Sequence, residues 1–190
     1  EGIEYYGLVP QKRTVLVTGG SLGAGMMNQA VRKNLEVIAG WKDVQVLWQC
    51  GSYYYEKLKA ELADFLPENV KLTAFLKRMD LAYACADVVV ARAGAGTISE
   101  LCLLAKATIL IPSPNVAEDH QTKNALALVN KQAAVMLKDS EAADKLIPAL
   151  SELLDHPEQL KLLSENIAGL AMPDSDTKIA REILNLIGNK

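Results

Sequence analysis

The feature that most constrains the fold is a regular alternation of short apolar runs with longer amphipathic stretches. Five runs rich in Val, Ile and Leu predict buried strands, at residues 15–18, 44–48, 70–74, 88–91 and 108–111, and a weaker sixth run lies at 133–137. Strands that are apolar along their whole length are typical of parallel sheets, because helices cover both faces of such a sheet. The sequence therefore predicts an α/β fold built on a doubly wound parallel sheet.

The amphipathic stretches between the runs predict helices. After the first run, a stripe of residues three or four positions apart predicts a helix that faces the sheet, formed by Met27, Ala30, Val31, Asn34 and Ile38. After Ser140 the strands stop, and helices are expected near 141–154, 157–167 and 175–188. We interpret residues 1–12 as a linker from a missing N-terminal domain, 13–172 as one ligand-binding domain and 173–190 as a C-terminal helix, a helical tail on the fold.

Composition excludes several classes of function. The 190 residues carry a formal net charge of −3 without a basic cluster, so we expect no nucleic-acid partner. The three cysteines show no CxxC spacing and predict reduced thiols in a cytoplasmic protein. The longest apolar run, near 101–111, is interrupted by Lys106 and is shorter than the roughly 20 residues that a bilayer requires, so this chain is not expected to insert into a membrane.

A glycine-rich turn, GGSLGAG at 19–25, follows the first predicted strand. Such a turn at the start of a helix presents backbone N–H groups and the positive end of the helix dipole, which together favour an anion such as phosphate. Met26 and Met27 stand where a Walker loop requires Lys and Ser or Thr, and the glycine spacing does not fit a dinucleotide fingerprint. A turn that needs glycine for geometry alone is the alternative.

A second turn, RAGAGTISE at 92–100, follows the fourth predicted strand. Thr97 and Glu100 have the spacing of a capping box, in which both side chains satisfy backbone amides at the helix start. The functional alternative is that Glu100 accepts hydrogen bonds from a sugar diol. Both turns lie at the carboxyl ends of parallel strands, where open α/β sheets bind ligands, so one nucleotide would contact both.

A third segment, residues 112–125, follows the fifth strand on the same edge. Glu118 and Asp119 are expected to cap the next helix, which leaves His120 and Gln121 to face the cleft as hydrogen-bonding groups. Neighbouring residues in sequence rarely converge on one metal ion, so no metal site is expected here. Asp174 and Asp176 are interpreted as a cap of the last helix and not as a metal clamp.

The ordered set GGSLGA, FLKRM (75–79), ADVVVARAGAGTISE and EDHQTKNA resembles the MurG-type family of bacterial transferases in glycosyltransferase family 28. The resemblance covers nearly the whole chain, but only the C-terminal, donor-binding half of a two-domain GT-B enzyme. It implies metal-independent, inverting transfer of N-acetylglucosamine from UDP-N-acetylglucosamine to a lipid-linked muramyl-peptide in peptidoglycan synthesis, without a cofactor. It further implies that the acceptor and the general base belong to the missing N-terminal domain, so no catalytic residue is expected in this chain. The whole enzyme would be cytoplasmic and peripheral on the inner membrane.

The resemblance also implies a role for each site residue. The turn with Gly20, Ser21 and Gly23 would hold the diphosphate, the backbone of Leu76 beside Phe75 would read the uracil, and Glu100 would bind the ribose. The sugar and phosphates would be lined by the backbone of Ala95 with Gly96 and Thr97, and Gln121 with His120 would contact the sugar hydroxyls. Gly25 departs from the family, which commonly has arginine there, and His120 stands where some members have glutamine.

Three other interpretations stay open from the residues. They are a natural single-domain subunit of a two-chain glycosyltransferase, a nucleotide-sugar binding module without turnover, and a dinucleotide-dependent dehydrogenase. The first is tested by searching for the N-terminal half in the same reading frame, the second by hydrolysis of the nucleotide sugar, and the third by NADH binding.

Overall fold

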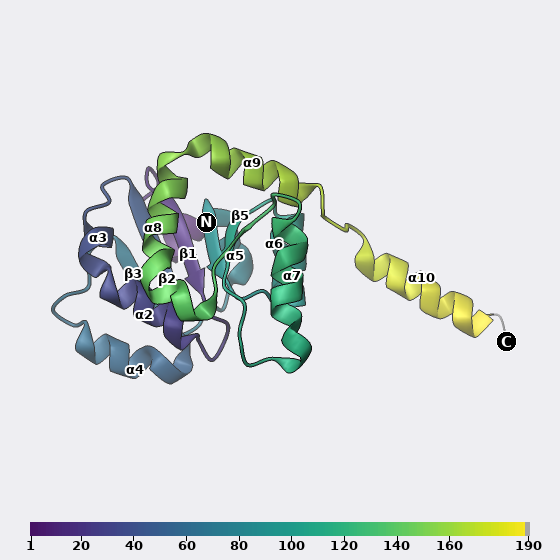
Figure 1. The fold of residues 1–190 in the computed structure, drawn as a ribbon, viewed down its shortest axis with the longest axis horizontal. Helices are drawn as coiled ribbons and strands as arrows, with labels where there is room; N and C mark the ends of the chain where they lie inside the picture. The colour runs from purple at the N-terminus through teal and green to yellow at the C-terminus, as the bar shows by residue number, and fades with distance from the viewer. Residues whose placement is uncertain (189–190) are drawn as a thin grey trace.

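The computed structural model describes residues 1–188, and at their centre is a six-stranded parallel sheet with the order β3-β2-β1-β4-β5-β6 (Figure 1). The strands are β1 (Arg13–Thr18), β2 (Val44–Gln49), β3 (Val70–Thr73), β4 (Val88–Ala91), β5 (Ala107–Leu110) and β6 (Val135–Met136). Every neighbouring pair is parallel. The doubly wound sheet expected from the sequence is confirmed, including the weak sixth strand, which is only two residues long.

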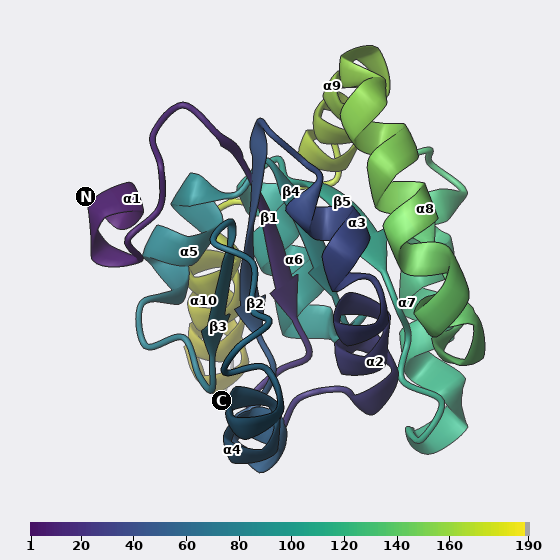
Figure 2. The same ribbon diagram turned by 90° about the vertical axis from the view of Figure 1, so that its left-hand side faces the viewer.

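Helices cover both faces of the sheet (Figure 2). They are α1 (Gly2–Tyr5), α2 (Gly25–Lys33), α3 (Leu35–Ala39), α4 (Ser52–Glu61), α5 (Met79–Cys85), α6 (Ala95–Leu103), α7 (His120–Val129), α8 (Ala142–Asp155), α9 (Pro157–Ala168) and α10 (Ser175–Gly188), with 3₁₀ turns η1 (Ala117–Asp119) and η2 (Asp139–Glu141). Successive strand residues point to opposite faces, so each strand contributes side chains to the hydrophobic core on each face of the sheet. Val15 and Val17 pack with α2, α3, α4 and α8, whereas Leu16 packs with α5, α6 and α7.

The stripe that begins at Met27 forms two helices instead of one. Met27, Val31 and Ile38 are buried as expected, but α2 ends at Lys33 and α3 begins at Leu35. The side chain of Asn34 donates a hydrogen bond to the Ala30 carbonyl oxygen at 2.8 Å, and its backbone leaves the helical region. An Asn side chain that bonds to nearby backbone competes with helix formation, which explains the break.

The segment before β1 packs against the domain. Helix α1 lies on α5, and the Tyr6 hydroxyl donates to the Arg78 carbonyl oxygen at 2.7 Å. Further along, Gln45 of β2 accepts a hydrogen bond from the Val9 amide at 2.8 Å and donates one to the Val9 carbonyl oxygen at 3.0 Å. These contacts hold the first residues against the rest of the domain.

Helix α10 projects away from the rest of the molecule (Figure 1), and this confirms the helical C-terminal tail. All of its described side chains are exposed, including the apolar ones of Ile179, Ile183, Leu184, Leu186 and Ile187. Within residues 1–188, no helix combines the length and the apolar character that crossing a membrane would require.

Candidate functional site

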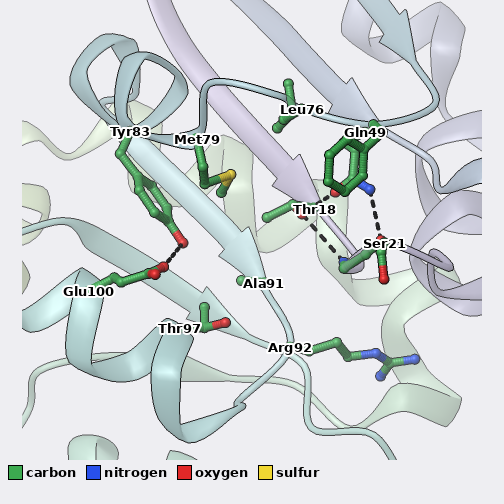
Figure 3. A pocket seen from close by; sticks show the side chains of 12 residues that line it. Thr18, Ser21, Gln49, Leu76, Met79, Tyr83, Ala91, Arg92, Thr97 and Glu100 are labelled. Atoms are coloured by element: carbon green, nitrogen blue, oxygen red, sulfur yellow. Dashed lines mark hydrogen bonds between the residues drawn. The ribbon is translucent and has the colours of Figure 1, made fainter.

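A cavity of about 250 Å³ opens at the carboxyl ends of β1 and β4. These two strands are neighbours at the point where the chain order reverses, from β1-β2-β3 on one side to β4-β5-β6 on the other. Open α/β sheets bind ligands at this switch point. The residues that line the cavity are Thr18, Gly20, Ser21, Gln49, Phe75, Leu76, Met79, Tyr83, Ala91, Arg92, Thr97 and Glu100 (Figure 3).

The first wall of the cavity is the glycine-rich turn between β1 and α2. Gly20 has a φ of +82° and no atom within 4 Å of the position that a Cβ would take, so its backbone borders open space. Helix α2 starts at Gly25 after the N-cap residue Ala24, and no side chain caps it. The amides of its first turn, which lack intrahelical partners as in every α-helix, therefore have no side-chain partner either and are open to an anion.

Gln49, at the end of β2, fixes the shape of this turn. Its Nε2 donates to the Gly20 carbonyl oxygen at 2.7 Å, and its Oε1 accepts a hydrogen bond from the Thr18 hydroxyl. The same Gly20 carbonyl oxygen accepts a hydrogen bond from the Gly23 amide at 2.9 Å. In a trans peptide the next N–H points opposite to the carbonyl, so the Ser21 amide is directed away from both donors.

Gly23 lies behind the cavity and holds two loops together. Its φ is +84°, and an added Cβ would overlap the carbonyl oxygen of Cys50. From the other side, an added Cβ on Gly51 would overlap the backbone of Gly23. Gly23 is thus required by the close approach of the turn to the loop after β2, and its amide is already used by Gly20.

The second wall is formed by α6, and here the capping-box alternative is wrong. The helix begins at Ala95 with Gly94 as its N-cap, and no side chain bonds to its first amides. Thr97 is therefore already in the first turn, and Glu100 lies in the second turn, beyond reach of the N-cap amide. The extended backbone of Gly94 starts the helix earlier than a Thr97 cap would.

Glu100 instead contacts Tyr83 of α5. Its Oε2 accepts a hydrogen bond from the Tyr83 hydroxyl at 3.0 Å, and both side chains border the cavity (Figure 3). Burial raises the pKa of Tyr83 above its usual value, and the neighbouring carboxylate raises it further. The phenol therefore stays protonated at neutral pH and remains a hydrogen-bond donor to Glu100.

Arg92, directly after β4, lines the cavity, but its guanidinium contacts groups outside the cavity lining. Its Nη1 donates to the carbonyl oxygens of Ile111 and Pro112, both at 3.1 Å, and lies 2.6 Å from Asp139 Oδ1. These contacts join the loops after β4 and β5 to η2. In Figure 3 its guanidinium points away from Glu100.

The segment before α7 differs from the expectation. Glu118 lies in η1, and the carboxylate of Asp119 accepts a hydrogen bond from the Thr122 hydroxyl at 2.6 Å. Asp119 stands at the N-cap position, but its left-handed backbone does not direct its carboxylate to the helix amides, so the expected side-chain capping is wrong. The Nδ1 of His120 lies 2.9 Å from the Ala117 carbonyl oxygen, and Gln121 Oε1 accepts from the Ser113 amide at 2.9 Å.

The site residues expected from the sequence divide into those that line the cavity and those that do not. Gly20, Ser21, Phe75, Leu76, Thr97 and Glu100 meet at the cavity, whereas Gly23, Ala95, Gly96, His120 and Gln121 do not line it. Six further residues line the cavity and were not predicted from the sequence, namely Thr18, Gln49, Met79, Tyr83, Ala91 and Arg92. The available signal was Gln49, a polar residue directly after the predicted second strand, 44–48.

No group of three or more potential metal-ligating side chains was found within residues 1–188. Near the start of α10, Asp176 Oδ1 accepts a hydrogen bond from the Thr177 amide at 2.7 Å, and the Asp174 carbonyl oxygen accepts one from Lys178 at 3.0 Å. Both residues therefore satisfy backbone amides at the beginning of the last helix.

A parallel sheet of this strand order, covered by helices on both faces, defines a Rossmann-like α/β domain, and the cavity lies where such domains bind ligands. The chain belongs to glycosyltransferase family 28, because the model of the family's C-terminal domain matches residues 14–179.

Similar proteins include two named UDP-N-acetylglucosamine--N-acetylmuramyl-(pentapeptide) pyrophosphoryl-undecaprenol N-acetylglucosamine transferase. The one from Bacteroides fragilis is 52% identical, and the match covers 98% of this chain and 49% of the relative. The one from Parabacteroides distasonis is 48% identical, and the match covers 100% of this chain and 51% of the relative. The chain therefore spans about half the length of the curated relatives it matches.

Among solved structures, that of Acinetobacter baumannii MurG superimposes with a TM-score of 0.76 at 26% identity and covers 100% of this chain and 53% of that one. A complex of MnaA from S. aureus with UDP has a TM-score of 0.68 at 15% identity, covering 99% of this chain and 49% of that one, which shows a shared fold.

Proposed function

We propose that this chain is the donor-binding half of an inverting N-acetylglucosaminyltransferase that uses UDP-N-acetylglucosamine. The acceptor would be the lipid-linked muramyl-peptide of peptidoglycan synthesis, as the names of the relatives suggest. The observation that carries the proposal is the cavity itself, where Gly20 and Ser21 of the glycine turn border the same space as Glu100. A turn with open amides suits a diphosphate, and a carboxylate suits a ribose diol.

The donor would lie across the switch point. The uracil would meet the backbone of Leu76, with the exposed ring of Phe75 beside it, and the ribose would meet Glu100. The diphosphate would lie at Gly20, Ser21 and the start of α2, with Gly23 holding the turn in shape. Farther along the edge, the transferred sugar would be lined by Ala95, Gly96, Thr97, His120 and Gln121.

The chemistry follows from the charge that develops as the donor breaks. Cleavage of the bond between the anomeric carbon and the diphosphate leaves negative charge on UDP. Amides fixed in advance at Ser21 and the α2 N-terminus would stabilise that charge without rearranging, in the manner of an oxyanion hole. The general base that deprotonates the acceptor hydroxyl would lie on an N-terminal domain outside this chain.

The proposal includes an arrangement for the whole protein. Residues 1–12 would connect to that N-terminal domain, 13–172 would bind the donor, and 173–190 would form a separate C-terminal helix. The complete enzyme would work at the cytoplasmic face of the inner membrane, because its proposed acceptor is anchored there by a lipid.

Calorimetry and thermal unfolding of the chain test the proposal. UDP and UDP-N-acetylglucosamine should bind and raise the melting temperature, because a ligand that binds only the native state stabilises it. UDP-glucose serves as the matched comparison for the acetamido group, and NADH as the comparison for a dinucleotide.

Two results would overturn the proposal. Absence of UDP binding would remove the donor site, and tight NADH binding without UDP binding would favour a dehydrogenase. Slow hydrolysis of UDP-N-acetylglucosamine by the chain would argue against a module that only binds.

A further inference from the structure

We propose that Tyr83 is a positioning residue that makes the site selective for ribose over deoxyribose, by holding the Glu100 carboxylate in one orientation. The inference rests on the proposed function, because it assigns Glu100 to the ribose. It adds a residue from α5 that lies outside the motifs that carry the family resemblance.

The geometry makes Tyr83 a rigid support. Its side chain is only 4% exposed and packs in the core with Leu16, Leu76 and Val89, so the position of its hydroxyl is set by the fold. The hydroxyl lies 3.0 Å from Glu100 Oε2. Glu100, by contrast, is exposed on α6, and within residues 1–188 its carboxylate has no second hydrogen-bond or ion-pair partner.

An exposed glutamate samples many rotamers, and ordering it costs conformational entropy when a ligand binds. A hydrogen bond from a buried phenol removes part of that cost in advance. The phenol stays protonated, so it donates to the carboxylate throughout the neutral pH range.

The arrangement also leaves room for the ligand. A carboxylate offers about four lone-pair sites, and Tyr83 occupies one of them on Oε2. The sites that remain on Oε1 and Oε2 suffice for the two adjacent hydroxyls of a ribose. A 2′-deoxyribose presents only one of these hydroxyls, so the oriented carboxylate gains less from it.

The test compares the affinities of UDP and 2′-deoxy-UDP, measured by calorimetry on the chain and its variants. The unmodified chain should prefer UDP, and Tyr83→Phe should reduce that preference by about three- to tenfold while 2′-deoxy-UDP affinity changes little. Glu100→Gln should remove most of the preference. Because Phe retains the ring that packs in the core, the comparison addresses the hydroxyl alone.

A double variant separates positioning from packing. If Tyr83 acts through Glu100, then Tyr83→Phe combined with Glu100→Gln should show the same preference as Glu100→Gln alone. Tyr6→Phe is the matched control, because it deletes another tyrosine hydroxyl that bonds to Arg78, outside the cavity. It should leave the preference for UDP unchanged.

The outcomes distinguish the two proposals. If UDP fails to bind the unmodified chain, the proposed function and this inference are both wrong. If UDP binds and Glu100→Gln removes the preference, but Tyr83→Phe retains it in full, the proposed function survives and the role of Tyr83 is rejected. Equal losses for both nucleotides in Tyr83→Phe would likewise reject it, since they indicate a structural role only.

Discussion

Gln49 illustrates how one buried amide side chain shapes a surface turn. The side chain is 4% exposed; its Nε2 donates to the carbonyl oxygens of Gly20 and Ala74, and its Oε1 accepts a hydrogen bond from the Thr18 hydroxyl. A leucine or valine would fill the same space in a parallel sheet, but it would leave the Gly20 carbonyl with one donor fewer. The orientation of the Ser21 amide thus depends on a residue 28 positions later in the chain.

Gln49→Met should therefore affect stability and diphosphate binding together. We expect the free energy of unfolding to fall by about 1–3 kcal/mol, because buried partners such as the Thr18 hydroxyl lose their hydrogen bonds. Affinity for UDP should fall, whereas affinity for uridine should not, since uridine lacks the diphosphate. Denaturant unfolding and calorimetry provide the two measurements.

The matched control is Gln45→Met at the opposite end of β2. Gln45 is equally buried and bonds to Val9 and Thr14, far from the cavity. It should lose a similar amount of stability and retain UDP affinity. Equal loss of UDP affinity in both variants would contradict the role assigned to Gln49.

Cys50 gives a pH-dependent prediction. Burial raises the pKa of its thiol to about 11 in the folded chain, from 9.0 for an unperturbed thiol. The thiol of the unfolded chain therefore loses its proton first as the pH rises. The contribution of the protonated Cys50 thiol to the free energy of unfolding is complete below pH 9 and disappears between about pH 9 and 11.

Thermal unfolding of the chain and of Cys50→Ala across that range measures the effect. The variant should lose less stability between pH 9 and 11 than the unmodified chain does, because the other titrating groups are common to both. Parallel stability curves for the two proteins would show that the thiol does not contribute.

At the scale of elements, the strands were the most predictable part of the fold. Predicted bounds such as 88–91 agree with the structure because fully buried, β-branched runs have few alternatives. The capping-box alternative for the start of α6 was wrong, because Thr97 matched a sequence pattern for capping while the extended backbone of Gly94 decided the boundary. The division between α2 and α3 was missed because it depends on one side-chain bond from Asn34.

The candidate site was predictable only in part, for a related reason. The glycine turn and Glu100 belong to local patterns that a single segment displays. Tyr83 and Gln49 reach the cavity from other elements, so their roles depend on tertiary packing that periodicity does not reveal. His120 and Gln121 were selected because their segment follows the fifth strand on the same sheet edge and because the family resemblance assigns them to the sugar. The structure places them outside the cavity lining.

Helix α10 should be dispensable for the stability of the domain. Its described side chains are all exposed, so they contribute little burial to the folded chain. Truncation after Met172 should change the melting temperature by no more than about 2 °C. Truncation after Asp155 is the control, because it also removes Leu163 and Ile167 from the cores and should lower the melting temperature strongly.

At the scale of the whole molecule, the sheet supplies the geometry that brings distant segments together. β1 and β4 are separated by β2 and β3 in sequence but are neighbours in space, so the turns after them face one cavity. The chain covers about half of the length of the curated relatives it matches, and the whole cavity is built within this half.

We expect donor binding to need no divalent cation, because the proposed phosphate contacts are backbone amides. UDP affinity should be the same, within about twofold, after exhaustive treatment with EDTA and after addition of Mg²⁺ or Mn²⁺. A tenfold or greater loss with EDTA, restored by either cation, would require metal ligands that the proposed arrangement does not include.

The contact between Gly23 and Gly51 has a consequence for how such a site tolerates mutation. Since the two backbones meet without room for a methyl group, a substitution at Gly51 would displace the neighbouring turn even though Gly51 does not border the cavity. Variation in the loop after the second strand is therefore expected to weaken nucleotide binding through steric displacement, and a screen restricted to cavity-lining positions would overlook it.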